Sequence, residues 1–240
     1  ALARYAAALD ADVVALQEVD GTSAAALVFP GYQFCFSSRS ALQNNGFAVR
    51  DGIPFRCGPE YRSLDIGNRV RRGVEVVVYP GDPREMVLLS VHLKSGCSDR
   101  PLATGNEACR LLASQVRPLE QWIESQARAR HRFAVLGDFN RSFSRSARDE
   151  FWNALDTQAA ADAGLIDVTA GMPFINCGPH QAFRTYIDHI VLGRRLAARL
   201  VPGSFTRITY SLLDAVTSRL SDHCPVAVRL RLDSGSGTGD

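Results

Sequence analysis

The chain has 240 residues, of which 46% are hydrophobic and 22% are charged. This composition is typical of a globular protein and excludes a mostly disordered chain. The 27 Lys and Arg residues against 25 Asp and Glu residues leave a net charge of +2, so any affinity for polyanions must be local. No apolar stretch approaches the ~20 residues of a membrane span, and we expect no such span.

The first third of the chain predicts one helix and three strands. Residues 1–10 are rich in Ala and Leu and predict a helix, whereas the short β-branched run within residues 11–20 predicts a buried strand. Residues 32–37 and 46–50 predict two further strands, joined through a loop with an Asn-Asn-Gly sequence. Residues 51–70 contain Gly, Pro and charged residues and predict a long loop.

The remainder alternates predicted strands with two helices. The helix expected at 106–130 has one apolar face, and Pro118 should kink or restart it. A shorter helix is expected at 149–155. Strands are predicted at 73–79, 86–93, 133–137, 186–192, 204–210 and 224–232.

This pattern gives eight or nine strands with few helices between them. Many of the connections are short, which favours antiparallel pairing. The chain shows no internal repeat and no break in composition. We therefore predict one domain over residues 1–232, built of two stacked sheets with helices outside, and a disordered tail over residues 233–240.

The six cysteines include no Cys-x-x-Cys pair, so a structural zinc site is not expected. Their even number permits three disulfides, although free cysteines also serve as small buried hydrophobic residues. Cys97 and Cys109 bracket a polar loop, and a bridge there would stabilise the fold by about 3 kcal/mol. We favour that bridge. It would imply an oxidising compartment and hence a periplasmic or secreted protein, although residues 1–240 show no signal peptide.

Polar residues stand where several predicted strands end or begin. Because the end of one strand lies beside the start of its antiparallel neighbour, these residues can gather along one edge of a sandwich. Clustered carboxylates repel one another unless a cation joins them, and oxygen ligands suit Mg²⁺ or Mn²⁺. The positions are Glu18, His92, Asp138, Asn140, Asp188, Asp222 and His223.

Each of these residues also has an ordinary structural explanation. Glu18 can be a solvated residue at a strand end, and Asp138 and Asn140 can stabilise a turn. His92 alone fits a buried histidine with satisfied hydrogen bonds. Asp188 is harder to explain in this way, because an unpaired carboxylate inside an apolar strand is costly.

The order of the motifs LQEVD, SVHLKS, GDFN, YIDHI and SDHCPV resembles the endonuclease/exonuclease/phosphatase superfamily, which has the fold of DNase I. The similarity runs from about residue 10 to 230, and the HLKSGC sequence with its neighbouring cysteines resembles a bacterial branch. The resemblance implies an α/β fold, a DNase I-like four-layered sandwich of two mainly antiparallel sheets flanked by helices. It also implies Mg²⁺-dependent attack of water on a phosphate ester.

The resemblance assigns one group of residues to the metal and the attacking water. Glu18 matches the main metal ligand, and Asp222 matches a second acidic position near the metal. Asp138 matches the residue that holds or deprotonates the water, and Asn140 matches the amide that orients it. These residue types suit phosphoryl transfer, which needs charge neutralisation and an aligned water.

A second group is matched to the phosphate. His223 corresponds to the histidine that binds the scissile phosphate, with Asp188 as its carboxylate partner. His92 corresponds to a second histidine of the DNase I-like and sphingomyelinase-like branches, where it stabilises the transition state or protonates the leaving oxygen.

Basic residues near these motifs are weaker candidates. Arg72, next to Arg71 and just before a predicted strand, and Lys94, after His92, are candidates to reach a phosphate, although a surface role is the more ordinary explanation. Residues 141–148, RSFSRSAR, predict either a polyanion-binding loop or a solvated loop.

These observations predict a divalent-metal-dependent phosphodiesterase, a nuclease acting as a monomer on nucleic acid. A phosphomonoesterase or a sphingomyelinase-like lipid phosphodiesterase is the first alternative, because the superfamily shares these residues across substrates. An inactive binding module is the second alternative.

The family pattern also places an Asn-bearing strand ahead of a helix like that at residues 1–10. We expect residues 1–240 to be less stable and less active than a form extended upstream by about 15–30 residues, roughly one strand and its lead-in.

Overall fold

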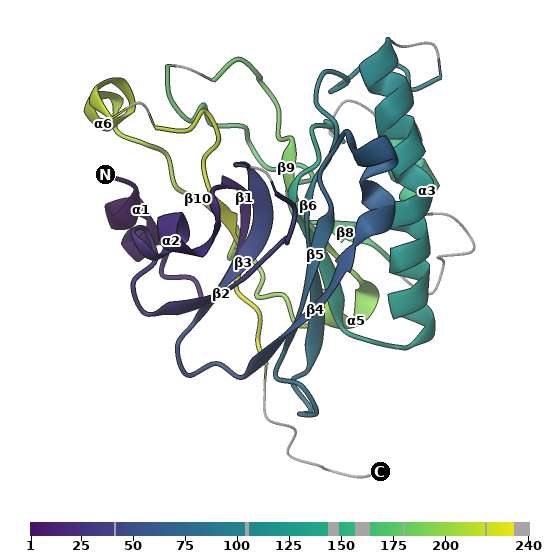
Figure 1. Cartoon of the computed structure of the whole chain (residues 1–240), viewed down its shortest axis with the longest axis horizontal. Helices are drawn as coiled ribbons and strands as arrows, with labels where there is room; N and C mark the ends of the chain where they lie inside the picture. The colour runs from purple at the N-terminus through teal and green to yellow at the C-terminus, as the bar shows by residue number, and fades with distance from the viewer. Residues whose placement is uncertain are drawn as a thin grey trace.

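A six-stranded mixed sheet forms the centre of the molecule (Figure 1). The computed structural model describes residues 1–40, 42–103, 106–143, 149–156, 164–179, 181–218 and 220–232. All neighbouring strands of this sheet are antiparallel except β6 and β7, which run parallel because α3 carries the chain from one to the other. In spatial order the strands are β4 (Phe55–Tyr61), β5 (Gly73–Val78), β6 (Met86–His92), β7 (Phe133–Asp138), β9 (Asp188–Leu192) and β8 (Ile166–Asp167).

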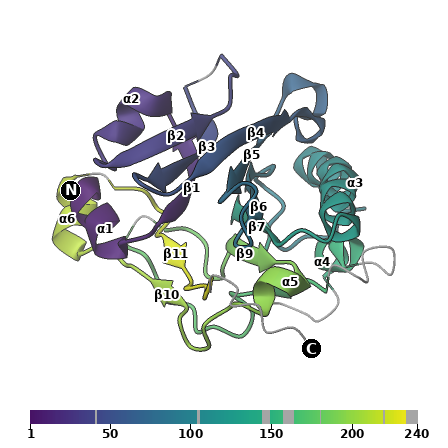
Figure 2. The same ribbon diagram turned by 90° about the horizontal axis from the view of Figure 1, so that it is seen from below.

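The second sheet layer consists of two separate pieces. One is an antiparallel three-stranded sheet in which β3 lies between β1 and β2, and the other is the short pair β10–β11. Figure 2 shows both pieces on the same side of the six-stranded sheet. Their strands are β1 (Val13–Val19), β2 (Tyr32–Phe36), β3 (Asn44–Arg50), β10 (Thr206–Arg207) and β11 (Val226–Ala227).

Helices cover the outer faces of these two layers (Figure 2). α3 (Glu107–Arg128) and α4 (Glu150–Leu155) lie on the six-stranded sheet, and α2 (Gly21–Ala26) lies on the three-stranded one. The shorter helices are α1 (Leu2–Leu9), α5 (Arg194–Ala197) and α6 (Leu212–Thr217). The arrangement is a four-layered α/β sandwich, which confirms the predicted fold class.

Three apolar clusters fill the three interfaces between the layers. The cluster under α3 and α4 contains large buried side chains such as Ile123, Phe133 and Phe151. The cluster between the two sheet layers joins Phe47 of β3 to β-branched residues of β5, including Val76. The smallest cluster lies under α2 around Ala48. Because strands of the central sheet face cores on both sides, they are apolar along most of their length.

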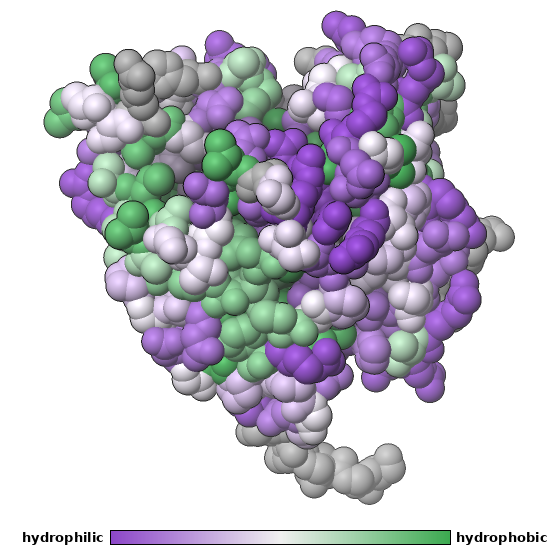
Figure 3. All heavy atoms as spheres, in the orientation of Figure 1, coloured by the Kyte–Doolittle hydropathy of each residue, from purple (hydrophilic) through white to green (hydrophobic). Residues whose placement is uncertain are grey.

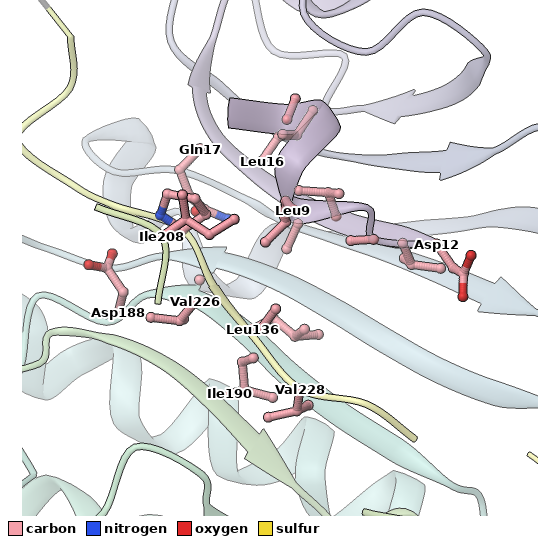
Figure 4. A pocket seen from close by; sticks show the side chains of 18 of the residues that line it. Leu9, Asp12, Leu16, Gln17, Leu136, Asp188, Ile190, Ile208, Val226 and Val228 are labelled. Carbon is pink, nitrogen blue, oxygen red and sulfur yellow. The ribbon is translucent and has the colours of Figure 1, made fainter. Parts of the chain in front are cut away.

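A groove of about 1200 Å³ separates the two pieces of the second layer (Figure 4). Its walls come from α1, β1, β7, β9, β10 and β11, and apolar side chains such as Leu9, Leu136 and Val226 line it. Within the described part of the chain, β1 pairs only with β3, and β11 pairs only with β10. Each therefore turns one strand edge toward the groove. At one end the groove reaches Gln17 and Asp188.

Several predicted elements differ from the observed ones. Residues 51–70, expected to be a loop, contain β4 and two turns of 3₁₀ helix at Arg62–Leu64 and Ile66–Asn68, because pairing with β5 stabilises an extended segment whose composition does not favour a strand. α3 runs through Pro118 as one helix instead of restarting there. Part of the predicted strand at 224–232 forms β11, and Leu230 bridges separately to Leu200. The predicted tail at 233–240 lies outside the described residues.

Three disulfides join all six cysteines, and the predicted Cys97–Cys109 bridge is one of them. Cys35–Cys57 links β2 to β4, and Cys177–Cys224 joins a loop to the residue that follows His223. These bonds are consistent with an oxidising compartment. Among the described residues, no helix combines the length and the apolar character that crossing a membrane requires.

Candidate active site

Three polar residues form a row across the central sheet. The register pairs His92 at the end of β6 with Asp138 at the end of β7, and Asp138 with Asp188 at the start of β9. His92 Nε2 lies 3.4 Å from Asp138 Oδ2, and the side chains of both residues are almost fully buried. Hydrogen bonding between strands therefore sets this part of the site directly.

The Gly-Asp-Phe-Asn turn holds the Asp138 carboxylate in one orientation. Gly137 has φ 134°, and a Cβ atom there would lie 2.1 Å from the carbonyl oxygen of Val91, so only glycine fits. Asn140 has φ 51°, a left-handed conformation that Asn tolerates better than most residues. Its backbone N–H donates to Asp138 Oδ1 at 2.7 Å, and its side-chain amide donates to Oδ2 at 2.9 Å. The same amide also donates to the carbonyl of Leu93 at 3.0 Å.

His223 joins this row from the segment ahead of β11. Its Nδ1 lies 2.8 and 3.0 Å from the two Asp188 carboxylate oxygens, and its Nε2 lies 4.0 Å from Asp138 Oδ2. The Tyr210 hydroxyl donates to the His223 carbonyl at 2.9 Å, and the Phe183 ring lies 4.9 Å from the imidazole, centre to centre. The imidazole is thus oriented from several sides.

Glu18 approaches from the other sheet layer. The pairing of β1 with β3 shifts between Leu16 and Val19, and Glu18 adopts φ 58° within that irregularity. Such a bulge redirects a side chain away from the regular alternation of a strand. The Glu18 side chain is half exposed, and its Oε1 lies 3.2 Å from Arg71 Nη2.

The surroundings of two site residues, Asp138 and His223, raise their pKa values. Burial raises the pKa of Asp138 to about 7, and the negative charges of Asp188 and Glu18 act in the same direction. Burial opposes protonation of His223, but its hydrogen bond to Asp188 and the nearby carboxylates raise its pKa to about 9. At neutral pH the site therefore holds a charged His223 beside a carboxyl group close to its titration midpoint.

The pKa of His92 is lowered instead of raised. Burial lowers its pKa to about 3, and the positive charges of Arg71, His223 and Lys94 contribute further. The ring is therefore neutral at physiological pH. Its Nδ1 is buried and forms no hydrogen bond within the described structure.

The donor set fits a divalent cation that prefers oxygen ligands. Ligand atoms of Asp138, Asp188 and His223 all lie within 4.8 Å of one another. Burial and then the negative charges of Asp188 and Glu18 raise the pKa of Asp138, and a bound cation would favour its ionised form. Glu18 and the exposed Asp222 lie outside this group of three, but their charges act on it: Glu18 on Asp138, and Asp222 on His223.

The predicted substrate-binding residues have other contacts. Arg72 pairs with Glu60 at 2.9 Å and with the buried Asp65 at 3.6 Å. The Lys94 ammonium group donates to the carbonyl oxygen of Ser95 at 3.0 Å, and its charge still reaches His92.

The loop at 141–148 differs from the predicted polyanion-binding or solvated loop where it is described. Arg141 is buried in an ion pair with Asp149, and Phe143 stacks on His189 in the core. Residues 144–148 lie outside the described structure.

Two neighbours of His223 were not anticipated from the sequence. Tyr210 and Phe183 are distant from His223 along the chain and carry no motif of their own, so no local signal identifies them.

The chain matches the Endonuclease/Exonuclease/phosphatase family over residues 1–223, and it therefore belongs to that family. Among solved structures, it is similar to a 3′-5′ exonuclease from Neisseria meningitidis, with 18% identity, a TM-score of 0.64 and coverage of 95% of this chain and 92% of that one. An AP endonuclease from Archaeoglobus fulgidus gives 13% identity, a TM-score of 0.63 and coverage of 95% and 92%. The human Nocturnin catalytic domain gives 17% identity, a TM-score of 0.58 and coverage of 93% of this chain and 83% of that one. A comparison with curated proteins finds no match.

Proposed function

We propose that this protein is a divalent-metal-dependent phosphodiesterase that hydrolyses nucleic-acid phosphodiester bonds. The observation that carries the proposal is the group of Asp138, Asp188 and His223, whose ligand atoms lie within 4.8 Å of one another; the pKa values of Asp138 and His223 are both raised there. Membership of the family supports hydrolysis of a phosphoric ester.

Each residue of the site has its own role in the proposed hydrolysis. Asp138, with a pKa of about 7, suits proton acceptance from an attacking water, and Asn140 fixes the orientation of that carboxylate. His223, held charged by Asp188, can donate from Nε2 to a non-bridging phosphate oxygen. Glu18 and Asp222 would hold Mg²⁺ or Mn²⁺ together with the carboxylates of this cluster. A bound cation would neutralise charge on the phosphate oxygens and lower the pKa of water.

His92 has a narrower role in this scheme than the family resemblance implies. Its lowered pKa leaves the imidazole neutral near neutral pH, and a neutral ring is a far weaker acid than a charged one. We assign it instead to neutral hydrogen bonding beside Asp138, 3.4 Å away.

Nucleic acid is the favoured substrate. A Neisseria 3′ phosphatase structure, with 17% identity and a TM-score of 0.63, contains a product DNA hairpin, and the Archaeoglobus neighbour is an AP endonuclease. We also propose that the protein acts as a secreted or periplasmic monomer, in keeping with its three disulfides.

A lipid phosphodiester is the second candidate, and one feature favours it. α6 exposes the apolar side chains of Leu212, Leu213 and Val216, each more than half accessible. The helix begins directly after Ser211, which follows the Tyr210 that contacts His223. An apolar rim so placed suits the hydrophobic part of a lipid.

The test compares substrates under identical conditions. Supercoiled DNA, RNA, bis-p-nitrophenyl phosphate, an inositol phosphate and sphingomyelin would each be incubated with Mg²⁺, Mn²⁺ or EDTA. We expect cation-dependent cleavage of nucleic acid, and loss of that cleavage in Asp138→Asn. Sphingomyelin turnover alone would favour the lipid candidate. The absence of both hydrolysis and cation binding would identify an inactive binding module.

A further inference from the structure

The side chains of Arg71 and Arg72, which directly precede β5, lie in different surroundings. Arg72 is paired with Glu60 and Asp65. Burial would raise the pKa of Glu60, but hydrogen bonds from Ser38 and Arg72 lower it to about 2. The positive charge of Arg72 is therefore neutralised within a structural ion-pair network.

Arg71 turns toward the active site instead. Its Nη2 lies 3.2 Å from Glu18 Oε1 and 2.7 Å from Gln43 Oε1. Its charge also acts on His92, the neighbour of Asp138 in the row across the sheet. The guanidinium thus lies beside the expected cation ligand, and its charge acts on the row that contains the expected site of water attack.

Arg71 also has hydrogen-bonding capacity that the protein does not use. The side chain is 25% exposed, and its Nε is buried without an acceptor among the described residues. A guanidinium presents five N–H donors in a planar fork that matches two oxygens of a phosphate. An anion with several acceptor oxygens can approach the exposed part of this guanidinium.

We infer that Arg71 binds the phosphate group of the substrate, and that in the ligand-free protein it serves as the counter-charge of Glu18. The inference rests on the proposed function, in which a cation and a phosphate ester meet at this site. It has a consequence that a purely structural arginine would lack. Removing Arg71 should weaken phosphate binding but strengthen cation binding, because the arginine competes with the cation for Glu18 and repels it.

The experiment measures both affinities by isothermal titration calorimetry, with Mn²⁺ alone and then with inorganic phosphate in the presence of Mn²⁺. For Arg71→Gln we expect phosphate affinity to fall about 10- to 100-fold and Mn²⁺ affinity to rise about two- to fivefold. Arg71→Lys keeps the charge without the fork, so its phosphate affinity should be intermediate.

Arg69→Gln is the matched control, because it removes one positive charge two residues away. Arg69 pairs with Glu107, and both side chains are more than half exposed. Both affinities of this variant should stay within about twofold of wild type.

Unchanged phosphate affinity in Arg71→Gln, or wild-type phosphate affinity in Arg71→Lys, would overturn the inference. A parallel loss of both affinities with a lower melting temperature in Arg71→Gln would also overturn it, since it would indicate structural damage. If wild-type protein binds neither Mn²⁺ nor phosphate, the proposed function itself fails, and this inference fails with it. If wild-type protein binds and hydrolyses while Arg71→Gln is unaltered, only the role of Arg71 is refuted.

Discussion

The two halves of the sandwich support the candidate site in different ways. In the central sheet, continuous strand pairing fixes His92, Asp138 and Asp188 in one row, and a core under α3 backs them. In the second layer, Glu18 projects from an irregular edge strand, and His223 precedes the short β11, with the groove between them. In the view of Figure 3, the surface over β1–β3 is also more apolar than the surface over α3.

From this difference we expect the row in the central sheet to be rigid and the second layer to be more adjustable. The row that contains the proposed proton acceptor takes its geometry from backbone hydrogen bonds between paired strands. Glu18 and His223, which we expect to contact the cation and the phosphate, belong to a layer with fewer strand pairs. Changes in the second layer should therefore alter cation and phosphate binding before they alter the row.

The largest effect is expected from Glu18→Gln, which removes a charge but little volume from the second layer. We expect hydrolysis at limiting Mg²⁺ to fall about a thousandfold or more, with little change in melting temperature because the side chain is half exposed. Steady-state rates across a Mg²⁺ titration check this. A wild-type rate at limiting Mg²⁺ would exclude Glu18 as a metal ligand.

The link between the two halves is the contact of His223 with Asp188. Because Asp188 acts through the imidazole, His223→Ala and Asp188→Asn should each cost about 3 kcal/mol of transition-state stabilisation, and the double variant should cost little more. A double-mutant cycle on kcat/KM measures this coupling. Additive losses would contradict the pairing.

The disulfides allow a matched test of the two regions. Replacing Cys177 and Cys224 with Ser should cost about 2–4 kcal/mol of stability and also reduce kcat/KM about tenfold, since Cys224 follows His223. Replacing Cys35 and Cys57, which join β2 to β4, should reduce stability alone. Chemical denaturation and assays of folded protein at low temperature separate the effects. Equal losses of kcat/KM in the two variants would contradict this difference between the two disulfides.

The smallest effect concerns the rigid row and its dependence on pH. The pKa of Asp138 rises from about 4 when unfolded to about 7 when folded, so its stabilising contribution is complete below pH 4 and is lost as the pH rises through 7. In EDTA, the unfolding free energy of the wild-type protein should fall as the pH rises from 4 through 7. We expect this fall to be about 1–3 kcal/mol larger than the corresponding fall in Asp138→Asn. Urea unfolding at pH 4.5, 6 and 8 measures the difference, and parallel profiles would contradict it.

The sequence alone was sufficient to predict the sandwich and the motifs. Alternation and β-branched runs mark most of the strands, because each strand must present apolar side chains to a core. Gly137, Asp138 and Asn140 are recognisable from the GDFN motif, and the structure adds the reason for it: a Cβ atom at Gly137 would collide with Val91, and Asn140 has a left-handed backbone. The Cys97–Cys109 bridge could also be predicted, since both cysteines flank one short loop.

Other features were decided only when distant segments met. β4 forms because β5 offers it a partner, although its own residues favour a loop. Two neighbouring arginines acquire separate roles because Glu60 and Asp65 occupy Arg72, while Glu18 and Gln43 contact Arg71. The pKa values of Asp138, His223 and His92 likewise depend on burial and on charges from other strands. A sequence pattern records which groups are present, but their protonation and partners depend on distances that exist only in the folded chain.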